Sequence, residues 1–304
     1  MSILVLGSSG LLGTYLVQYL ESKSLKVLGS HRLKDGLLQR HYDVTVPGDL
    51  ERFLSACHPQ VIINLVAMTD VAACEKYPKN AEMLNSLSAK SVSSWIKRFS
   101  PGTYLIHIST DHVYGQGLGP HKETSVRALN VYAKTKLDAE KHVLNLERSI
   151  CLRTSFIGKS VNNRRASFTD WIYKTVVVNE RPVKLYGDVL FSPVSMKTLA
   201  RGIEECLRNR PSGLINFGSR SGLSKDRAGR LFLDTFCYKR DLVETISYGD
   251  SRQAEECCRP MDMRMDVSKV EGLLGTRMPS FQDELECISN EYDHDDHHKW
   301  SRSR

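Results

Sequence analysis

The chain opens with the stretch 2-SILVLGSSGLLGTYLVQYLE-21, in which a short apolar run leads into three glycines and then into a segment with helical periodicity. Strand, glycine turn and helix in this order are typical of the first unit of a dinucleotide-binding fold. We expect Gly7 to permit the tight turn, Gly10 to let backbone N–H groups approach a pyrophosphate, and Gly13 to let the helix pack closely on the strand. The predicted cofactor site also includes the residues between these glycines, Ser9, Leu11 and Leu12.

The second predicted strand, residues 25–29, is followed by Ser30-His31-Arg32, where an NAD-binding fold carries an acidic residue. An acidic side chain there binds the ribose 2′-hydroxyl and repels a 2′-phosphate, whereas an arginine accommodates the phosphate. We therefore predict NADPH as the cofactor, in contact with His31 and Arg32, and keep NADH as the alternative. The other interpretation of Arg32 is a solvated charge in a loop.

Two later segments of the first half are expected to complete the cofactor site. Residues 59–67 read as a buried parallel strand, and small residues at the end of such a strand let the backbone lie against a dinucleotide. An earlier segment carries an aspartate that is placed to meet the adenine end. The predicted contacts from these segments are Asp43, Val44, Val66, Ala67 and Thr69. The alternation of strands and helices up to residue 155 predicts an α/β fold with a parallel, doubly wound sheet.

The predicted chemistry depends on a strand that reads 105-LIHISTDHVY-114 and on a helical segment after it. That segment places Tyr132 and Lys136 four residues apart, on one face of a helix. We expect the lysine ammonium to lower the pKa of the phenol, which is near ~10 when free. Thr110 or Ser109 could hydrogen-bond the same substrate oxygen. These groups suit proton transfer to a carbonyl oxygen, which is half of a carbonyl reduction.

The composition bounds the class of protein. With 304 residues, of which 41% are hydrophobic, the chain can form one large or two modest domains with a sizeable core. It has no run of ~18 apolar residues and no basic, apolar leader, so we expect neither a membrane-spanning helix nor a signal peptide. Eight cysteines without a C-x-x-C pair favour reduced thiols in the cytoplasm. The net charge of +7 comes without a basic helix rich in aromatics, so no nucleic-acid partner is expected.

The remaining expectations concern the domain boundaries. We predict a dinucleotide-binding domain over residues 1–158, to which later parts of the chain can return, and a mainly substrate-binding domain over 159–288. Residues 289–304 are charged and rich in His and Asp, and we predict a disordered tail with no metal site. Asn85 lies in a predicted helix over 79–98, where it is either satisfied by a neighbour or supports the active site.

The motifs together resemble the extended short-chain dehydrogenase/reductase family, and within it the dTDP-4-dehydrorhamnose reductase branch. The segments that carry this resemblance are 7-GSSGLLG-13, 61-VIINLVAMTDVAACE-75, 109-STDHVY-114, 132-YAKTK-136, 152-LRTSF-156, 259-RP-260 and 266-DVSK-269. It covers residues 1–288. It implies a Rossmann-type cofactor domain with a smaller C-terminal α/β substrate-binding domain. It also implies hydride transfer from NAD(P)H to a keto carbon, with Thr110, Tyr132 and Lys136 as the catalytic triad.

The resemblance further implies a nucleotide-linked 4-keto-6-deoxy sugar as the substrate, in the synthesis of surface polysaccharide precursors. Tyr132 would protonate the keto oxygen, and both Tyr132 and Lys136 would contact the cofactor. The predicted substrate contacts are Thr69, Asp111, His112, Phe156 and Arg259. His112 and Phe156 depart from the aromatic residue and the tryptophan that are usual in this branch, which puts the identity of the sugar in question. Relatives of this kind are commonly dimers, so a homodimer is a further expectation.

Two alternatives remain open. This branch includes regulatory subunits of methionine adenosyltransferase, which retain the cofactor fold to bind a partner, and the changes at the predicted sugar pocket fit a non-catalytic NADP-binding subunit. A nucleotide-sugar epimerase is the second alternative. A dehydratase is disfavoured because Thr110 is followed by Asp111 and His112 instead of Asp-Glu. The intact triad favours the enzyme, since a scaffold has no chemical need for it.

Overall fold

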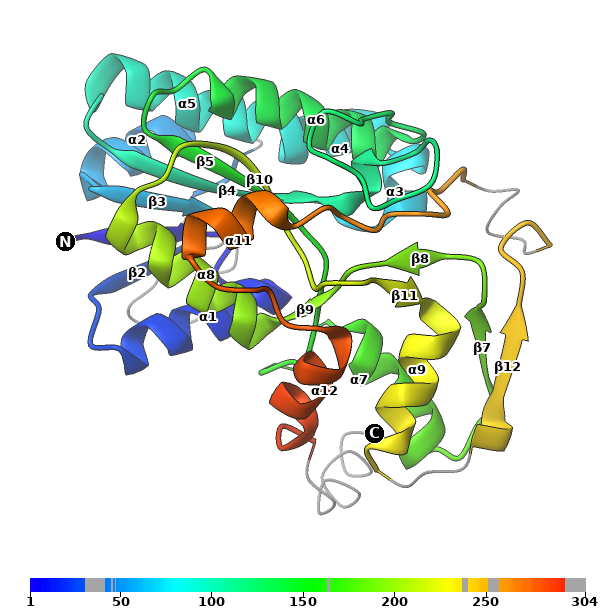
Figure 1. The fold of residues 1–304 in the computed structure, drawn as a ribbon. Coiled ribbons are helices and arrows are strands. Elements are labelled where there is room, and N and C mark those ends of the chain that lie inside the picture. Colours follow the sequence, from blue (N-terminus) through cyan, green and yellow to red (C-terminus); the bar gives the residue numbers. More distant parts are fainter. Residues whose placement is uncertain are drawn as a thin grey trace.

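A computed structural model describes residues 1–30, 42–44, 46, 48–162, 165–236, 240–250 and 257–292. Its main layer is a six-stranded parallel sheet with the strand order β10-β5-β4-β3-β1-β2 (Figure 1). The strands are β1 (Ile3–Leu6), β2 (Val27–Ser30), β3 (Val61–Asn64), β4 (Tyr104–Thr110), β5 (Ser149–Thr154) and β10 (Gly213–Phe217). The chain leaves β1 toward β2 on one side and continues from β3 on the other. The switch point of a doubly wound sheet therefore lies between β1 and β3.

Helices cover both faces of this sheet (Figure 1). One face carries α1 (Leu11–Ser22), α8 (Met196–Asn209) and α11 (Ser268–Leu274), and the other carries α2 (Asp49–Cys57), α5 (Ser88–Phe99) and α6 (Val131–Leu144). Because side chains alternate along a strand, β1 supplies Ile3 and Val5 to the first core and Leu4 and Leu6 to the second. Burial on both faces is why these strands read as continuous apolar runs. This architecture confirms the predicted fold class.

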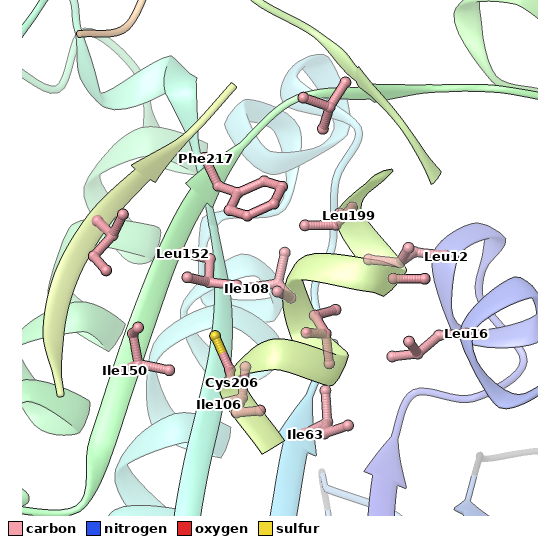
Figure 2. Close-up of a cluster of buried hydrophobic side chains, with 14 of the residues drawn as sticks. Leu12, Leu16, Ile63, Ile106, Ile108, Ile150, Leu152, Leu199, Cys206 and Phe217 are labelled. Atoms are coloured by element: carbon pink, nitrogen blue, oxygen red, sulfur yellow. The ribbon is translucent and has the colours of Figure 1, made fainter. Parts of the chain in front are cut away.

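The core on the α1 side joins segments that are far apart in the sequence. Figure 2 shows Leu12 and Leu16 of α1 in one cluster with Leu199 of α8 and with Ile63 and Ile106 of the sheet. Residues after 190 thus help to hold the first helix on the sheet. As the predicted boundaries allowed, α8, β10 and α11 return to the main layer from within residues 159–288.

A smaller unit lies beside the main layer and contains short ladders (Figure 1). Its parallel pairs are β7 (Val183–Tyr186) with β12 (Val243–Ile246) and β6 (Phe156–Ile157) with β9 (Val194–Ser195); β8 (Leu190–Phe191) and β11 (Leu223–Ser224) are antiparallel. The helices packed on them are α7 (Phe168–Ile172), α9 (Lys225–Asp234) and α12 (Phe281–Ser289). A π-helical turn, Tyr173–Val178, extends α7. This unit has its own core, with Phe232 and Leu285 at its centre.

The remaining elements fill the connections. The predicted helix 79–98 is built from α4 (Pro78–Ala81), a π-helical turn (Glu82–Leu87) and α5, with α3 (Val71–Lys76) before it. Short 3-10 turns cover Asp111–Val113 and Arg240–Leu242. None of the helices in the described ranges is long and apolar enough to cross a membrane.

The predicted tail begins too early in the sequence. Ser289 ends α12, and Tyr292 is buried in the core of the smaller unit. The Tyr292 hydroxyl donates a hydrogen bond to Asp170 Oδ1 at 2.9 Å. Assigning residues 289–292 to a disordered tail was therefore wrong, because one buried aromatic ring holds this charged segment on the fold. Residues 293–304 lie outside the described part of the chain.

Candidate active site

A cavity of about 870 Å³ opens at the carboxyl ends of β1, β3, β4 and β5. Every predicted cofactor, catalytic or substrate residue that the structure describes lines this cavity. His31 and Arg32, which were also predicted to contact the cofactor, lie outside the described residues. The cavity sits at the switch point of the sheet, where doubly wound folds bind their ligands. Strand ends far apart in the sequence meet there because parallel strands end at the same edge.

The glycine turn leaves room for a ligand at the start of α1. Gly7 has a φ of +80°, which side-chain-bearing residues rarely adopt. A Cβ on Gly13 would lie 2.3 Å from the Gly7 carbonyl oxygen, so only glycine lets α1 approach β1 this closely. Gly10 is the N-cap of α1 and, within the described residues, no side chain caps the helix N–H groups. Unshared N–H groups at a helix N-terminus fit the pyrophosphate of a dinucleotide.

Two hydroxyls converge on the other end of the cavity. Thr110 is the last residue of β4, and its hydroxyl lies near the Tyr132 phenol of α6 and lowers the pKa of that phenol. The Asn130 side chain caps α6 by accepting a hydrogen bond from Ala133 N at 2.8 Å. This cap lies two residues before Tyr132 and fixes the start of the helix, so that the phenol is directed at the strand end. A substrate carbonyl oxygen placed between the two hydroxyls could accept a hydrogen bond from each.

The structure decides between the two hydroxyls that the sequence left open. The Ser109 hydroxyl donates to Glu140 Oε1 at 2.5 Å. Glu140 is in turn held by Arg153, which donates from Nε at 2.9 Å and from Nη2 at 2.7 Å, with both side chains almost fully buried. Ser109 therefore belongs to the buried network between β4, β5 and α6, and Thr110 is the hydroxyl beside Tyr132.

Lys136 does not act on Tyr132 as we expected. Burial raises the pKa of Tyr132 above its usual value, and the Asp111 charge adds to this, while the nearby Thr110 hydroxyl lowers it. The Lys136 ammonium instead donates to the Ile108 carbonyl at 2.7 Å. Burial lowers the pKa of Lys136 to about 8, against the opposing effect of Glu140. The prediction that Lys136 lowers the pKa of the phenol was therefore wrong. Tyr132 stays a protonated phenol at neutral pH.

The predicted substrate contacts lie next to this pair. Burial raises the pKa of Asp111 to about 7, and burial lowers that of His112 to about 3, so the imidazole is neutral at physiological pH. The His112 ring meets the Tyr132 ring edge-on, with 5.5 Å between the centroids. Arg259 Nε is buried and has no hydrogen-bond partner in the described part of the chain. A guanidinium with such a buried, unshared N–H group suits a sugar that carries an anionic group.

Asn85 is hydrogen-bonded to its neighbours and also holds part of the cavity wall, so both interpretations offered for it from the sequence apply. Its Oδ1 accepts from Met68 N at 2.7 Å, and its Nδ2 donates to Met68 O and to Thr135 Oγ1. It therefore fixes the backbone that precedes Thr69 in the cavity wall and ties this backbone to α6. The π-helical turn that carries Asn85 is a feature often found at functional sites.

Sequence reasoning missed two side chains near the substrate end. Phe168 lines the cavity from the start of α7, where Ser167 and Asp170 form a capping box. The Ser-x-x-Asp pattern at 167–170 was a usable signal for this position. Lys225 begins α9, and its charge acts on both Asp111 and His112. No motif marks Lys225, because only the folding of the smaller unit brings the start of α9 close enough for its charge to act on Asp111 and His112.

The fold and the Tyr132/Lys136 pair define a protein of the extended short-chain dehydrogenase/reductase type. Comparison with protein families is more specific. The chain belongs to the RmlD substrate binding domain family, whose family model matches residues 1–294. This match confirms the resemblance to the dTDP-4-dehydrorhamnose reductase branch.

Curated relatives match most of the chain. A dTDP-4-dehydrorhamnose reductase of Escherichia coli is 32% identical, over 96% of this chain and 98% of the relative. A "Probable low-salt glycan biosynthesis reductase" of Haloferax volcanii is 26% identical, over 93% of this chain and 96% of the relative. Methionine adenosyltransferase 2 subunit beta of Xenopus tropicalis is 24% identical, over 91% of this chain and 84% of the relative.

Solved structures show the same fold. The dTDP-4-dehydrorhamnose reductase of Bacillus anthracis, in complex with NADP, has a TM-score of 0.82 with this chain at 22% identity. The match covers 96% of this chain and 99% of that one. The Rossmann-type sheet and the smaller unit thus occur together in a protein that binds NADP.

Proposed function

We propose that this protein is an NADPH-dependent reductase of a nucleotide-linked 4-keto-6-deoxy sugar, acting in the synthesis of surface polysaccharide precursors. The neighbouring hydroxyls of Thr110 and Tyr132, in one cavity with a glycine turn that no described side chain caps, are the observation that carries this proposal. The cavity can hold a dinucleotide at one end and a sugar at the other. The names of the E. coli and H. volcanii relatives support a reductase, and the NADP in the B. anthracis structure supports the cofactor.

Each step of a carbonyl reduction is assigned to a different group of residues. Gly7, Gly10 and Gly13 hold the pyrophosphate of the cofactor, which supplies a hydride to the keto carbon when it is bound. Tyr132 donates its phenol proton to the carbonyl oxygen, so that the C=O bond becomes an alcohol. The Lys136 ammonium, which also lines the cavity, offers its remaining N–H group to the cofactor.

The substrate end of the cavity is assigned to the sugar. Thr110 donates a hydrogen bond to the oxygen that Tyr132 protonates. Arg259, whose Nε has no hydrogen-bond partner among the described residues, pairs with a phosphate of the nucleotide, and Phe156 packs against the sugar. The homodimer, the preference for NADPH through Arg32, and the division of the chain near residue 158 remain predictions.

A second function is favoured by one observation. The X. tropicalis relative is a methionine adenosyltransferase subunit, and it matches 91% of this chain. A chain of that kind would bind NADPH through the glycine turn without turnover. The two functions differ in whether the Tyr132 proton is used, so they can be separated by experiment.

The test follows the absorbance of NADPH after adding freshly generated dTDP-4-keto-6-deoxyhexose to the purified protein. We expect oxidation of NADPH that depends on the sugar, with kcat lowered by about 10²- to 10⁴-fold in a Tyr132→Phe variant. The matched control is Tyr19→Phe, which removes a hydroxyl that donates to Glu204 away from the cavity. Tight NADPH binding without turnover on this or other nucleotide 4-keto sugars would support the regulatory subunit. Conversion of a nucleotide sugar without net NADPH oxidation would support an epimerase.

A further inference from the structure

A buried histidine contacts the lysine of the active site. His107 lies on β4, within the sheet, and is 0% exposed. Its Nε2 lies 3.3 Å from Lys136 Nζ, which also donates to the Ile108 carbonyl at 2.7 Å. Two of the three N–H donors of the ammonium thus have partners on β4. The third remains for a ligand, since Lys136 also lines the cavity.

The protonation state of His107 follows from its surroundings. Burial, together with the charge of Lys136, holds the pKa of His107 well below its usual value, so the imidazole is neutral. Facing an ammonium, the neutral ring can only accept at Nε2, and its proton therefore sits on Nδ1. His107 Nδ1 is buried and has no hydrogen-bond partner within the described residues. A buried, unshared N–H group costs stability, and an apolar side chain would avoid that cost.

We propose that His107 is a positioning residue, whose Nε2 accepts a hydrogen bond from Lys136 and, with the Ile108 carbonyl, holds the ammonium in the cavity wall beside Tyr132. This inference rests on the proposed function, in which that ammonium offers an N–H group to the cofactor. The lysine side chain has four rotatable bonds, and a single carbonyl acceptor leaves it free to turn about one hydrogen bond. A second acceptor from the adjacent residue of the same strand fixes its direction.

The other titratable groups around Lys136 do not replace His107. Within the described residues, the groups that act on its charge are Glu140 on its own helix and the Cys151 thiol on β5. The Glu140 carboxylate accepts hydrogen bonds from Arg153 and Ser109. Burial raises the pKa of Cys151, so this thiol stays protonated and uncharged at neutral pH. His107 is therefore the side chain that accepts a hydrogen bond from Lys136.

The test measures the ionisation of Lys136 directly and does not need turnover. Competitive labelling of the full chain with acetic anhydride, read by peptide mass spectrometry, gives the fraction of unprotonated Lys136 at each pH. We compare wild type with His107→Leu, which removes the acceptor, and His107→Gln, whose carbonyl oxygen can replace Nε2. Losing a hydrogen bond to a charged group should lower the Lys136 pKa by about one to two units in His107→Leu, and His107→Gln should restore it.

Two further measurements distinguish a role of His107 in positioning Lys136 from a role in packing the core. Leu105→Val alters an apolar side chain on the same face of β4 and leaves both hydrogen-bond acceptors of Lys136 in place, so it should leave the Lys136 pKa at its wild-type value. In unaltered protein, the ¹⁵N shifts of His107 should show the tautomer with its proton on Nδ1, which needs no variant to fold. An unchanged Lys136 pKa in His107→Leu, an equal shift in Leu105→Val, or a proton on Nε2 would each overturn the proposal.

Activity gives an independent comparison. If wild type reduces the sugar, His107→Leu should lower kcat about tenfold with an unchanged KM for the sugar, and its rate should fall with rising pH earlier than in wild type. If wild type has no turnover, the proposed function fails while the labelling and the tautomer still decide the role of His107. If turnover is present and labelling is unchanged in His107→Leu, the role of His107 fails and the reductase stands.

Discussion

The cavity has two walls of different construction. One is built from the glycine turn, the ends of β3 and β4, and α6; its side chains include Thr110 and Tyr132. The other is built from short segments of the smaller unit and from the chain near Arg259. The first wall is set by a six-stranded ladder covered on both faces, whereas the second depends on two-stranded ladders of two to four residues.

This difference separates chemistry from recognition. Proton transfer requires hydroxyls held to within a fraction of an ångström, and the ends of a buried sheet provide that rigidity. A binding wall of short ladders and loops can change its side chains without disturbing the sheet. We therefore expect changes in the first wall to affect cofactor binding and kcat, and changes in the second to affect KM.

Among the changes that test this difference between the two walls, closing the space at the glycine turn should have the largest effect. In Gly13→Ala the new Cβ would lie 2.3 Å from the Gly7 carbonyl oxygen and 2.8 Å from Ser8 Cα, which are both backbone atoms. Overpacking of this kind costs about 1–3 kcal/mol, and α1 must shift from β1. This shift displaces the N–H groups at the start of α1 that would bind the pyrophosphate. We therefore expect NADPH affinity to fall by about 100-fold, as measured by fluorescence titration.

Gly102→Ala is the matched control for this change. A Cβ on Gly102 meets nothing within 4 Å, and this glycine lies far from the cavity. NADPH affinity should stay at its wild-type value. Equal losses of affinity in the two variants, or none in Gly13→Ala, would contradict the role given to the close approach of α1 and β1.

A smaller effect is expected in the second wall. Arg259→Gln removes a guanidinium whose Nε is buried and free of partners within the described chain. A lost charge-assisted hydrogen bond should raise KM for the sugar nucleotide about tenfold, with kcat and NADPH affinity unchanged. Arg227→Gln, an exposed arginine on α9, should leave KM unaltered. A loss confined to kcat would mean that Arg259 belongs with the chemistry of the first wall.

The smallest effect concerns the pH dependence of reduction. Burial raises the pKa of Asp111 to about 7, and its charge raises the pKa of Tyr132. As pH rises through 7, Asp111 loses its proton, Tyr132 becomes a weaker acid, and kcat should step down by less than about fivefold. Asp111→Asn stays neutral and should abolish this step. The loss of the Lys136 proton, whose pKa is about 8, should still lower the rate above pH 8 in both proteins.

A profile that is identical in wild type and Asp111→Asn would show that Asp111 does not ionise next to Tyr132 during turnover. A profile that rises through pH 8 would contradict the ammonium form of Lys136 in catalysis. Both results come from the same series of initial rates, measured at saturating sugar and NADPH.

The groups of the first wall could be predicted because their spacing is local. Short spacing within one element predicts how its residues are arranged. This holds for the three glycines within seven residues and for the tyrosine and lysine one helical turn apart. Other contacts could not be predicted from spacing. The spacing of Tyr132 and Lys136 on one helix does not predict where the ammonium of the lysine lies. In the structure, this ammonium is hydrogen-bonded to Ile108 and His107 on β4.

Adjacent hydroxyls raise the same difficulty. Ser109 and Thr110 point to opposite faces of β4, and only the position of Glu140 on α6 shows which of them lies beside Tyr132. The tail was misjudged for a related reason. Tyr292 sits in a charged segment, and its burial depends on a pocket between α7, α9 and α12 that no local pattern describes.

The amino-acid sequence by itself determined the parallel sheet, the glycine turn and the Tyr132/Lys136 helix, because hydrophobic periodicity and short-range spacing act within one element. The tertiary structure decided which hydroxyl lies beside Tyr132, which groups hold Lys136, and which side chains of the smaller unit reach the substrate end. Those outcomes depend on burial and on contacts between residues far apart in the chain. Burial also changed the sign of the expected shift in the Tyr132 pKa, because desolvation outweighs a charge that is directed elsewhere.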